Sequence, residues 1–542
     1  MGIPTYFSHI VKNHSKIIKK ITELDKNVDN LYLDSNSIIY DSLGKLQGGS
    51  MEFQDIDNFE FELIKKVCCK INEYIKSTNV LSRVIVAFDG VAPVAKLKQQ
   101  RNRRYKSVLE KELMNEFKKA NKETNKAPLN GYDPRSWNKT AITPGTRFMD
   151  KLNKYVTEIY SGEEYDNLEI LISGSNIEGE GEHKIFEYIR ENPSYHQETT
   201  SFIYGLDADL IMLCLNHLPI TKNLYLYRET PEFIKSLNSN LNPNEQYVLD
   251  IPVLSREIKM GWTNKYGFGG LNNTSKMYDY IFICFFLGND FLPHFPAMNI
   301  RTKGIDILLD AYNTVMTEND FLYKNGKIQW NNVFKFVKYL SDCEYDNLIE
   351  EYTIRNKWEK RSYGNDTEED QIKKYLNIPL KNRTIEKYID PYKPFWKNRY
   401  YTSLFKNDYN NDFIKKICMN YLEGLDWVMA YYTTGCVDWR WKYNYDYPPL
   451  LSDLIKYIPQ WDCEFLERKP KNPVTSRVQL SHVLPKSSLQ LIPNNKYITL
   501  LKYVPEYYDD DCEIVWAFCK YMWESHVILP TIDIEYLEEL LV

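Results

Sequence analysis

Seven acidic residues stand in short stretches whose composition suits phosphate chemistry. They are Asp34, Asp89, Glu180, Glu182, Asp207, Asp209 and Asp290. Many carboxylates gathered at one place repel one another unless hard cations lie among them, and oxygen-only ligand sets suit Mg²⁺ or Mn²⁺. We therefore predict a phosphoryl-transfer site with two metal ions roughly 3.5 to 4 Å apart, which activate a water and stabilise the leaving oxygen.

Three of these acids end apolar runs, at residues 31–34, 84–89 and 202–207. Each run is too short for a helix and too apolar for a surface loop, so it predicts a strand buried on both faces. Open α/β sheets place their sites at the carboxyl ends of parallel strands. The sequence thus predicts an α/β fold that brings the acids to one sheet edge.

A basic segment follows the strand that is expected to end near Asp89. The formal net charge is −6, but it would be +1 without the seven acids, and residues 96–106 hold six basic side chains and no acid. Within this segment no Gly or Pro occurs after Pro93, which predicts a helix from about Val94 onward. On one face of this helix would lie Lys96, Gln100, Arg103 and Arg104. Such a face suits a phosphate group, although a solvated helix face or a nuclear-import signal would look alike.

Composition sets the remaining limits. The chain has 542 residues, of which 43% are hydrophobic, enough for two or more folded domains. The ten cysteines include no Cys-x-x-Cys pair, which favours reduced thiols inside the cell. The longest apolar stretch, 280–287, is far shorter than the roughly 20 residues of a membrane span. We expect a cytoplasmic protein, with the nucleus as the alternative.

Composition shifts suggest three regions. Residues 1–345 would form a domain that carries the acids and the phosphate face, and 346–394 a charged linker or surface excursion, irregular from about 352. Residues 395–542 turn aromatic and helical, and would pack back to wall the site. Most of the aromatic side chains in this last region would be core, with Trp439 or Trp441 the candidate to stack on a base. His183 and His294 are expected to make structural hydrogen bonds.

Several stretches of the chain, in order, resemble the XRN family of 5′→3′ exoribonucleases. These stretches are 88–104, 141–149, 179–185, 205–210 and 288–294, followed by 395–401, 421–427, 435–441 and 478–485. The resemblance thus covers nearly the whole chain. Four positions depart from the usual family pattern, namely Ser37, Tyr40, Val94 and Glu178. None of these departures removes one of the seven acids.

The resemblance implies a PIN/FEN-like nuclease core, with a central, mostly parallel sheet flanked by helices, and a mainly helical second region. It implies that the seven acids hold two Mg²⁺ ions, with Mn²⁺ possible, and that the four residues of the basic face bind a 5′-monophosphate. Tyr40 stands where a base-stacking His is common and can stack through its own ring. The implied function is processive 5′→3′ hydrolysis of 5′-monophosphorylated single-stranded RNA to mononucleotides, in RNA decay.

The resemblance further implies a short form without the carboxyl-terminal domains of large cytoplasmic members, and a monomeric core. Two other functions stay open on the residues alone. A structure-specific DNA flap nuclease would share the acids but would be expected to carry a duplex-binding helical motif, which the sequence does not show. A non-catalytic RNA-binding scaffold would be expected to have lost acids, and all seven are present.

Overall fold

The computed structural model describes most of the chain. The described residues are 5–24, 26–120, 132–162, 165, 167–229, 241–242, 245–266, 274–364, 367–509 and 512–541, with the backbone alone at 113–120, 262–266 and 274. The chain forms two compact units. We call Ile10–Ser255 with Lys471–Asp510 and Pro530–Val542 the sheet unit, and Met1–His9 with Arg256–Pro470 and Asp511–Leu529 the helical unit.

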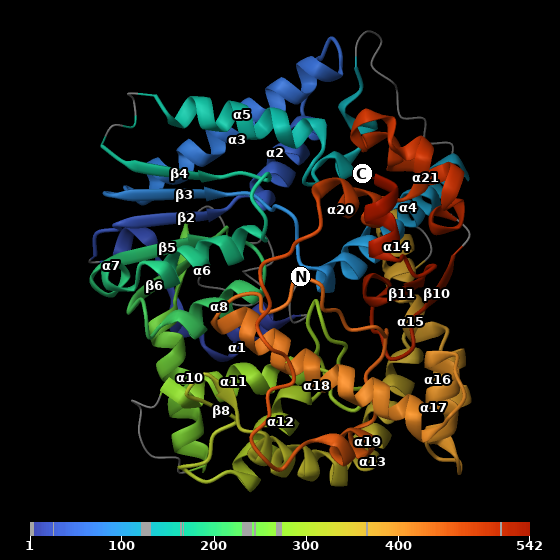
Figure 1. Ribbon diagram of the computed structural model, residues 1–542. Helices are drawn as coiled ribbons and strands as arrows, with labels where there is room; N and C mark the ends of the chain where they lie inside the picture. The colour runs from blue at the N-terminus through green and yellow to red at the C-terminus, as the bar shows by residue number, and fades with distance from the viewer. Residues whose placement is uncertain are drawn as a thin grey trace. The chain divides into compact units, whose positions relative to one another are not determined.

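The sheet unit is built on seven strands in the order β1-β7-β6-β5-β2-β3-β4. Their bounds are β1 Ile18–Lys20, β2 Asn30–Asp34, β3 Arg83–Ala87, β4 Glu169–Ser173, β5 Thr200–Tyr204, β6 Asn223–Arg228 and β7 Tyr247–Asp250. Strands β6, β5, β2, β3 and β4 run parallel, while β7 is antiparallel to β6 and to β1. The expected α/β architecture with a mostly parallel sheet is confirmed (Figure 1).

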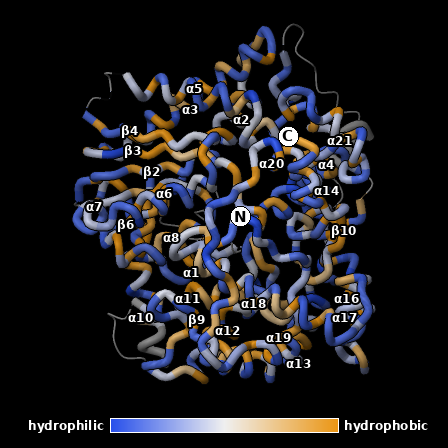
Figure 2. The backbone as a smooth tube through the Cα atoms, in the orientation of Figure 1, coloured by the Kyte–Doolittle hydropathy of each residue, from blue (hydrophilic) through white to orange (hydrophobic). Residues whose placement is uncertain are grey.

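Both faces of the central strands are covered, as their unbroken apolar sequence predicts. Leu31 and Leu33 of β2 point into a core shared with α2, α3 and α5. Tyr32 points to the opposite face, where its hydroxyl lies 2.8 Å from His196 Nε2 beside α6 and α7. The apolar residues of these strands can be followed as orange segments in Figure 2.

Helices complete the sheet unit. Their bounds are α2 Asn36–Gly48, α3 Ile56–Thr78, α4 Val94–Ala120, α5 Arg147–Tyr160, α6 Gly181–Glu191, α7 Pro193–Glu198, α8 Asp209–His217, α20 Ser476–Val483, α21 Tyr497–Tyr503 and α22 Ile534–Leu541. A second core joins the start of α4, through Val94 and Leu97, to α20, α21 and α22. The predicted start of the basic helix at Val94 is confirmed, and residues from the end of the chain hold that helix in place.

The helical unit contains further helices of very different length. They include α11 Thr274–Cys284, α12 Gly304–Val315, α13 Trp330–Glu359, α14 Glu368–Leu376, α15 Ile378–Lys381, α16 Thr384–Ile389, α17 Trp396–Phe405, α18 Asn411–Thr433 and α19 Leu451–Leu454. Helices α1 Tyr6–Asn13 and α10 Ile251–Tyr266 each cross from one unit to the other along the chain. Two hairpins, β8 Tyr323–Lys324 with β9 Lys327–Ile328 and β10 Glu513–Val515 with β11 His526–Ile528, complete the unit. The expected helical character of the second region is confirmed.

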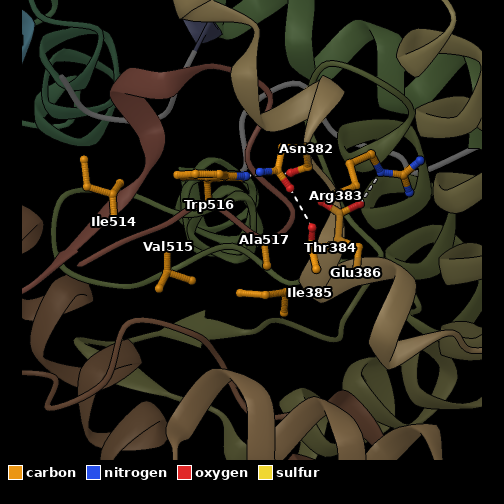
Figure 3. A pocket seen from close by; sticks show the side chains of 9 residues that line it. All are labelled: Asn382, Arg383, Thr384, Ile385, Glu386, Ile514, Val515, Trp516 and Ala517. Carbon is orange, nitrogen blue, oxygen red and sulfur yellow. Dashed lines mark hydrogen bonds and ion pairs between the residues drawn. The ribbon is translucent and has the colours of Figure 1, made fainter. Parts of the chain in front are cut away.

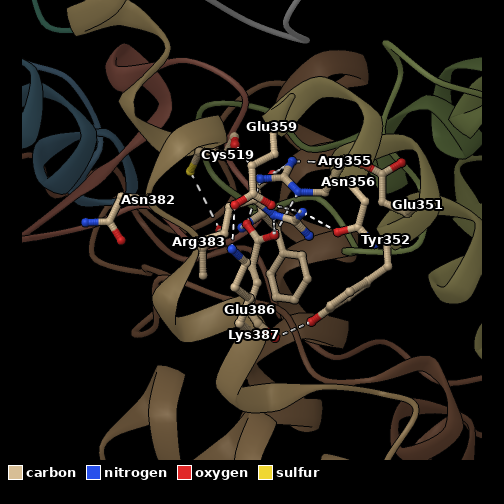
Figure 4. Close-up of polar contacts among 12 residues, drawn as sticks. Glu351, Tyr352, Arg355, Asn356, Glu359, Asn382, Arg383, Glu386, Lys387 and Cys519 are labelled. Carbon is tan, nitrogen blue, oxygen red and sulfur yellow. Dashed lines mark hydrogen bonds and ion pairs between the residues drawn. The ribbon is translucent and has the colours of Figure 1, made fainter. Parts of the chain in front are cut away.

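The expectation of irregular structure at 352–394 is wrong. The long helix α13 continues to Glu359, and α14, α15 and α16 follow. The charges in this segment are partly internal, since Arg355 and Arg383 both bind the buried carboxylate of Glu386 (Figure 4). A buried ion pair and a solvated charge look the same in composition, which is why the sequence suggested a surface excursion.

The two compact units do not follow the predicted boundaries at 345 and 395. The sheet unit takes residues from the last quarter of the chain, and the helical unit begins at Arg256 in its main segment. The predicted spans also include residues outside the described ranges. In the part of the chain that the structure describes, no helix is both long and apolar enough to cross a membrane.

Candidate active site

Three neighbouring strands, β3, β2 and β5, bring acids to one edge of the sheet. Asp34 is the last residue of β2, Asp89 follows β3 by two residues, and Asp207 follows β5 by three. The strands pair in parallel, with Asp34 opposite Ala87 and Leu33 opposite Tyr204. The carboxyl ends of all three strands therefore meet, as the sequence predicts for these acids.

The start of α6 brings two more acids to this edge. The backbone N–H of Gly181 donates to Asp89 Oδ1 at 2.8 Å, which fixes the loop that carries Glu180 and Glu182. A Cβ atom on Gly181 would lie only 2.6 Å from Asp34 Oδ1, so the backbone comes this close only because the residue is glycine. Glu180 and Glu182 are both buried.

The carboxylates of this edge act on one another electrostatically. Burial raises the pKa of Asp34 well above its usual value, and the charges of Asp89 and Asp207 raise it further. Burial likewise raises the pKa of Glu182, with added repulsion from Asp207 and Glu180. Asp209, the first residue of α8, is buried, whereas Asp207 is exposed. We call Asp34, Asp89, Glu180, Glu182, Asp207 and Asp209 the acid cluster.

One lysine lies within the acid cluster. Lys96 Nζ is 2.6 Å from Glu180 Oε1, and both side chains are buried. Among the described residues, no three His, Cys, Asp or Glu side chains already stand close enough together to hold a metal ion. The role of the acids as metal ligands stays a prediction.

Two polar residues that the sequence did not single out hold Asp89 in place. Asn36 Nδ2 donates to Asp89 Oδ2 at 2.6 Å, and Asn36 Oδ1 accepts the Asp89 backbone N–H at 3.1 Å. Lys184 Nζ donates to the carbonyls of Phe88 and Gly174, each at 2.8 Å. Burial lowers the pKa of Lys184 to about 8. Their positions, two residues after Asp34 and after Glu182, are the only signal in the sequence that could have pointed to them.

The predicted phosphate face of α4 is partly buried. Besides Lys96, Arg104 is buried and donates to Thr143 Oγ1 at 2.8 Å and to the Gln100 carbonyl at 3.2 Å. Burial and the charge of Arg103 lower the pKa of Arg104 to about 10, while the charges of Tyr40 and Asp89 act in the opposite direction. Arg104 is thus within electrostatic reach of the acid cluster.

The other members of the face are more open. Arg103 is exposed, and Gln100 is half-buried, with an Oε1 atom that accepts no hydrogen bond from any residue the structure describes. Tyr40, on α2, is 44% exposed. These side chains leave polar groups and one ring accessible next to the buried cations, and their binding roles stay predictions.

Three predicted site residues lie in the helical unit. Asp290 follows the short helix η6 Phe285–Leu287 and is half-buried. Trp439 and Trp441 are only 8% and 7% exposed. Trp441 stacks on Trp427 with ring centroids 5.3 Å apart and donates to Glu423. This packing favours a core role for Trp441, and base stacking by either ring stays a prediction.

The helical unit also has a small pocket of about 180 Å³ (Figure 3). It lies between the start of α16 and strand β10, where Trp516 Nε1 donates to the Asn382 carbonyl at 2.7 Å. No predicted site residue lines it. Its lining of aliphatic, amide and mutually paired charged groups offers no catalytic set.

Two family models match the chain over nearly its full length. Residues 1–230 match the model described as "XRN 5'-3' exonuclease N-terminus", and residues 272–390 and 386–541 match the "Xrn1 helical domain". The chain belongs to the XRN family. The resemblance inferred from the short motifs is therefore confirmed.

Individual XRN relatives agree with this assignment. The chain is 27% identical to 5'-3' exoribonuclease 1 of Schizosaccharomyces pombe over 98% of its own length and 48% of the relative's. It is 27% identical to 5'-3' exoribonuclease 1 of Homo sapiens over 98% of its length and 33% of the relative's. The chain thus spans half or less of these two relatives.

Among solved structures, the catalytic core of Rad2 in complex with DNA substrate matches 65% of this XRN chain and 80% of its own, with a TM-score of 0.30 and 13% identity. This similarity is too slight to support an argument about function. The XRN assignment depends on the family models and on the sequence relatives.

Proposed function

We propose that this chain is a metal-dependent 5′→3′ exoribonuclease that hydrolyses 5′-monophosphorylated single-stranded RNA to mononucleotides, as part of RNA decay. The observation that carries the proposal is the acid cluster at the carboxyl ends of β3, β2 and β5, beside the buried cations Lys96 and Arg104. Membership of the XRN family supports the RNA substrate and the 5′→3′ direction.

The donor chemistry of the acid cluster fits hard divalent cations, since its side chains supply carboxylate oxygens. Burial and like charge raise the pKa of Asp34 and of Glu182, and a bound cation would offset that cost of keeping them ionised. Mg²⁺ or Mn²⁺, two ions in our proposal, would be held by the six acids of the cluster together with Asp290. When bound, such ions lower the pKa of a water and stabilise charge on the leaving oxygen. Asn36 and the Gly181 N–H would keep Asp89 oriented as one of the ligands.

The residues of the α4 face would bind the terminal phosphate and so determine direction. Lys96, Gln100, Arg103 and Arg104 would donate to the phosphate of the first nucleotide. The bond that is cleaved would then be one nucleotide away, which gives mononucleotide products. Tyr40 would stack on the first base through its exposed ring, and Trp439 or Trp441 on another base.

Other features of the proposal follow from the family and stay predictions. They are processivity, a monomeric core, a cytoplasmic location with the nucleus as the alternative, and the roles of two stretches of the chain: 1–345 as the nuclease region and 395–542 as a region that walls the site.

One assay tests the central proposal. We would incubate the protein with labelled RNA and DNA strands that end in a 5′-monophosphate, a 5′-hydroxyl or a cap, and with a branched DNA, in the presence of Mg²⁺, Mn²⁺ or EDTA. The expected result is mononucleotides from 5′-monophosphorylated RNA only when a divalent ion is present. Cleavage of branched DNA alone would indicate a flap nuclease, and RNA binding without hydrolysis would indicate a scaffold.

A further inference from the structure

Six side chains of the helical unit form a row in which cations and aromatic rings alternate. They are, in order of contact, Arg361, Trp358, Lys520, Tyr521, Arg301 and Trp523. Lys520 Nζ lies 4.7 Å from the ring centroid of Trp358 and 5.1 Å from that of Tyr521. Arg301 Cζ lies 5.4 Å from the Tyr521 centroid and 5.3 Å from that of Trp523. We call this row the cation–aromatic ladder.

Buried contacts hold the ladder in place. Arg355 donates to the Cys519 carbonyl at 2.7 Å and to the Phe518 carbonyl at 3.3 Å, which places the segment after Cys519 beside the last turn of α13 (Figure 4). Glu524 accepts the backbone N–H of Lys520 at 2.7 Å and also pairs with Arg301. The side chains of the ladder are thus preorganised, which lowers the entropic cost of binding a ligand.

Positive charge is concentrated along the ladder. The pKa of Lys520 is lowered by burial and by the neighbouring charges of Arg301 and Arg361, although Glu524 acts against this. Two members at opposite ends are accessible, since Arg361 is exposed and Trp523 is 37% exposed. An exposed cation at one end and a partly exposed ring, stacked on Tyr521, at the other suit a ligand that carries both phosphates and bases.

We propose that the cation–aromatic ladder is a contact surface for single-stranded RNA, separate in sequence and in compact unit from the acid cluster. Arg361 would meet a phosphate and the Trp523 ring would stack on a base, while Lys520 and Arg301 add attraction for the strand. The choice of RNA depends on the proposed function.

The experiment measures binding without cleavage. Fluorescence anisotropy in EDTA would report the affinity of the full chain for a labelled single-stranded RNA of about 30 nucleotides at several salt concentrations. We expect Trp523→Ala to weaken binding by about 5- to 150-fold, the range for removal of one base stack. Arg361→Glu should weaken binding and reduce the slope of log K against log salt by about 0.7 for each RNA phosphate that the protein no longer neutralises.

A matched control comes from the sheet unit. Lys65 Nζ lies 4.3 Å from the ring centroid of Phe61, which is 42% exposed, and forms an ion pair with Glu62. Lys65→Glu and Phe61→Ala therefore make the same chemical changes at a cation–aromatic pair outside the ladder. Both variants should bind the RNA as the parent does.

The RNA affinities of these variants distinguish an RNA contact from a structural role of the ladder. Arg361 is exposed, so Arg361→Glu tests binding even if Trp523→Ala unfolds. RNA affinity of Arg361→Glu within twofold of the parent, or an equal reduction in Lys65→Glu, would overturn the proposal and leave the ladder as a structural brace or a protein contact. Hydrolysis by the parent with Mg²⁺ is measured in a separate assay, so failure of the proposed function and failure of the ladder are distinguishable.

Discussion

The molecule contains two groups of charged side chains, one wholly and one partly buried, that differ in the balance of positive and negative charge. In the helical unit, Glu386 accepts from Arg355 at 2.6 and 2.9 Å and from Arg383 at 2.5 Å. Burial alone would raise the pKa of Glu386, but the two guanidinium groups outweigh it and hold that pKa below its usual value. In the acid cluster, burial and like charge both raise the pKa of Asp34 and of Glu182.

The difference indicates two purposes. A buried carboxylate with two arginines has its charge satisfied within the chain, so its contribution is to structure. A group of six acids with Lys96 as the cation paired to Glu180 keeps an excess of negative charge at the edge of the sheet. Such an excess is costly unless a ligand compensates it, which is typical of functional sites.

The largest effect is expected from substitutions within the acid cluster. Asp207→Ala or Asp209→Ala should abolish RNA cleavage, to below about a hundredth of the parent rate, because the divalent ions lose a ligand. RNA binding should persist, since the α4 face is unchanged. The measurement is hydrolysis of 5′-monophosphorylated RNA with Mg²⁺ or Mn²⁺, together with binding in EDTA. Activity well above a hundredth of the parent would contradict the assignment of these acids.

Breaking the group formed by Arg355, Arg383 and Glu386 should lower the stability of the protein and leave RNA cleavage unaffected. Arg355→Met leaves Glu386 with one guanidinium partner fewer in a buried setting, and we expect a loss of about 3 to 5 kcal/mol in the free energy of unfolding. Urea denaturation checks this, with Lys338→Ala as control, since Lys338 pairs with Asp342 at the exposed surface of the same helix. A stable Arg355→Met variant that has lost hydrolysis would reverse the roles assigned to the two groups.

The same contrast shows what the sequence could predict. Strands β2, β3 and β5 were predictable because each is a short apolar run, and their carboxylates because each follows such a run. The contacts of Arg355 could not be predicted, because its partners Glu386 and Cys519 lie 31 and 164 residues away along the chain. Asn36 and Lys184 escaped for a related reason: each acts through a hydrogen bond to a residue on another element. Short sequence patterns predict which residues are buried and where a strand ends, whereas hydrogen bonds and ion pairs between distant residues depend on the folded structure.

A smaller effect should appear on the basic helix. Arg103→Ala should lower kcat/KM on 5′-monophosphorylated RNA by about 10- to 150-fold, since a charge-assisted hydrogen bond contributes about 1.5 to 3 kcal/mol. RNA with a 5′-hydroxyl should be affected far less. Arg103 is exposed, so folding should not change.

Arg101 on the same helix is the matched control for Arg103. It is buried and donates to the carbonyls of Pro530 and Tyr507 at 2.7 and 2.5 Å. Arg101→Ala should therefore lower the melting temperature without altering the preference between the two RNA ends. Equal reductions by Arg103→Ala on both RNA ends would show a general backbone contact and no reading of the 5′ phosphate.

The last expected effect concerns the dependence of stability on pH and on metal ions. The folded-state pKa values of Asp34 and Glu182 lie above those of the unfolded chain, so the folded protein binds more protons between the two values. In EDTA, the stability of the protein should therefore rise as pH falls from 7.5 to 5, by at most about 1.4 kcal/mol per pH unit for each carboxyl. Glu386 has a lowered pKa, so its contribution is lost only at more acidic pH, as pH falls below the ordinary glutamate range.

Saturating Mg²⁺ should remove the pH dependence of stability that arises from the acid cluster, because a metal-bound carboxylate no longer takes up a proton. Melting temperatures at pH 5, 6 and 7.5, with EDTA or Mg²⁺, test this, and Glu182→Gln should flatten the EDTA curve. Parallel EDTA and Mg²⁺ curves would mean that the acids do not bind the ion, and the contrast between the two buried groups would then be one of structure alone.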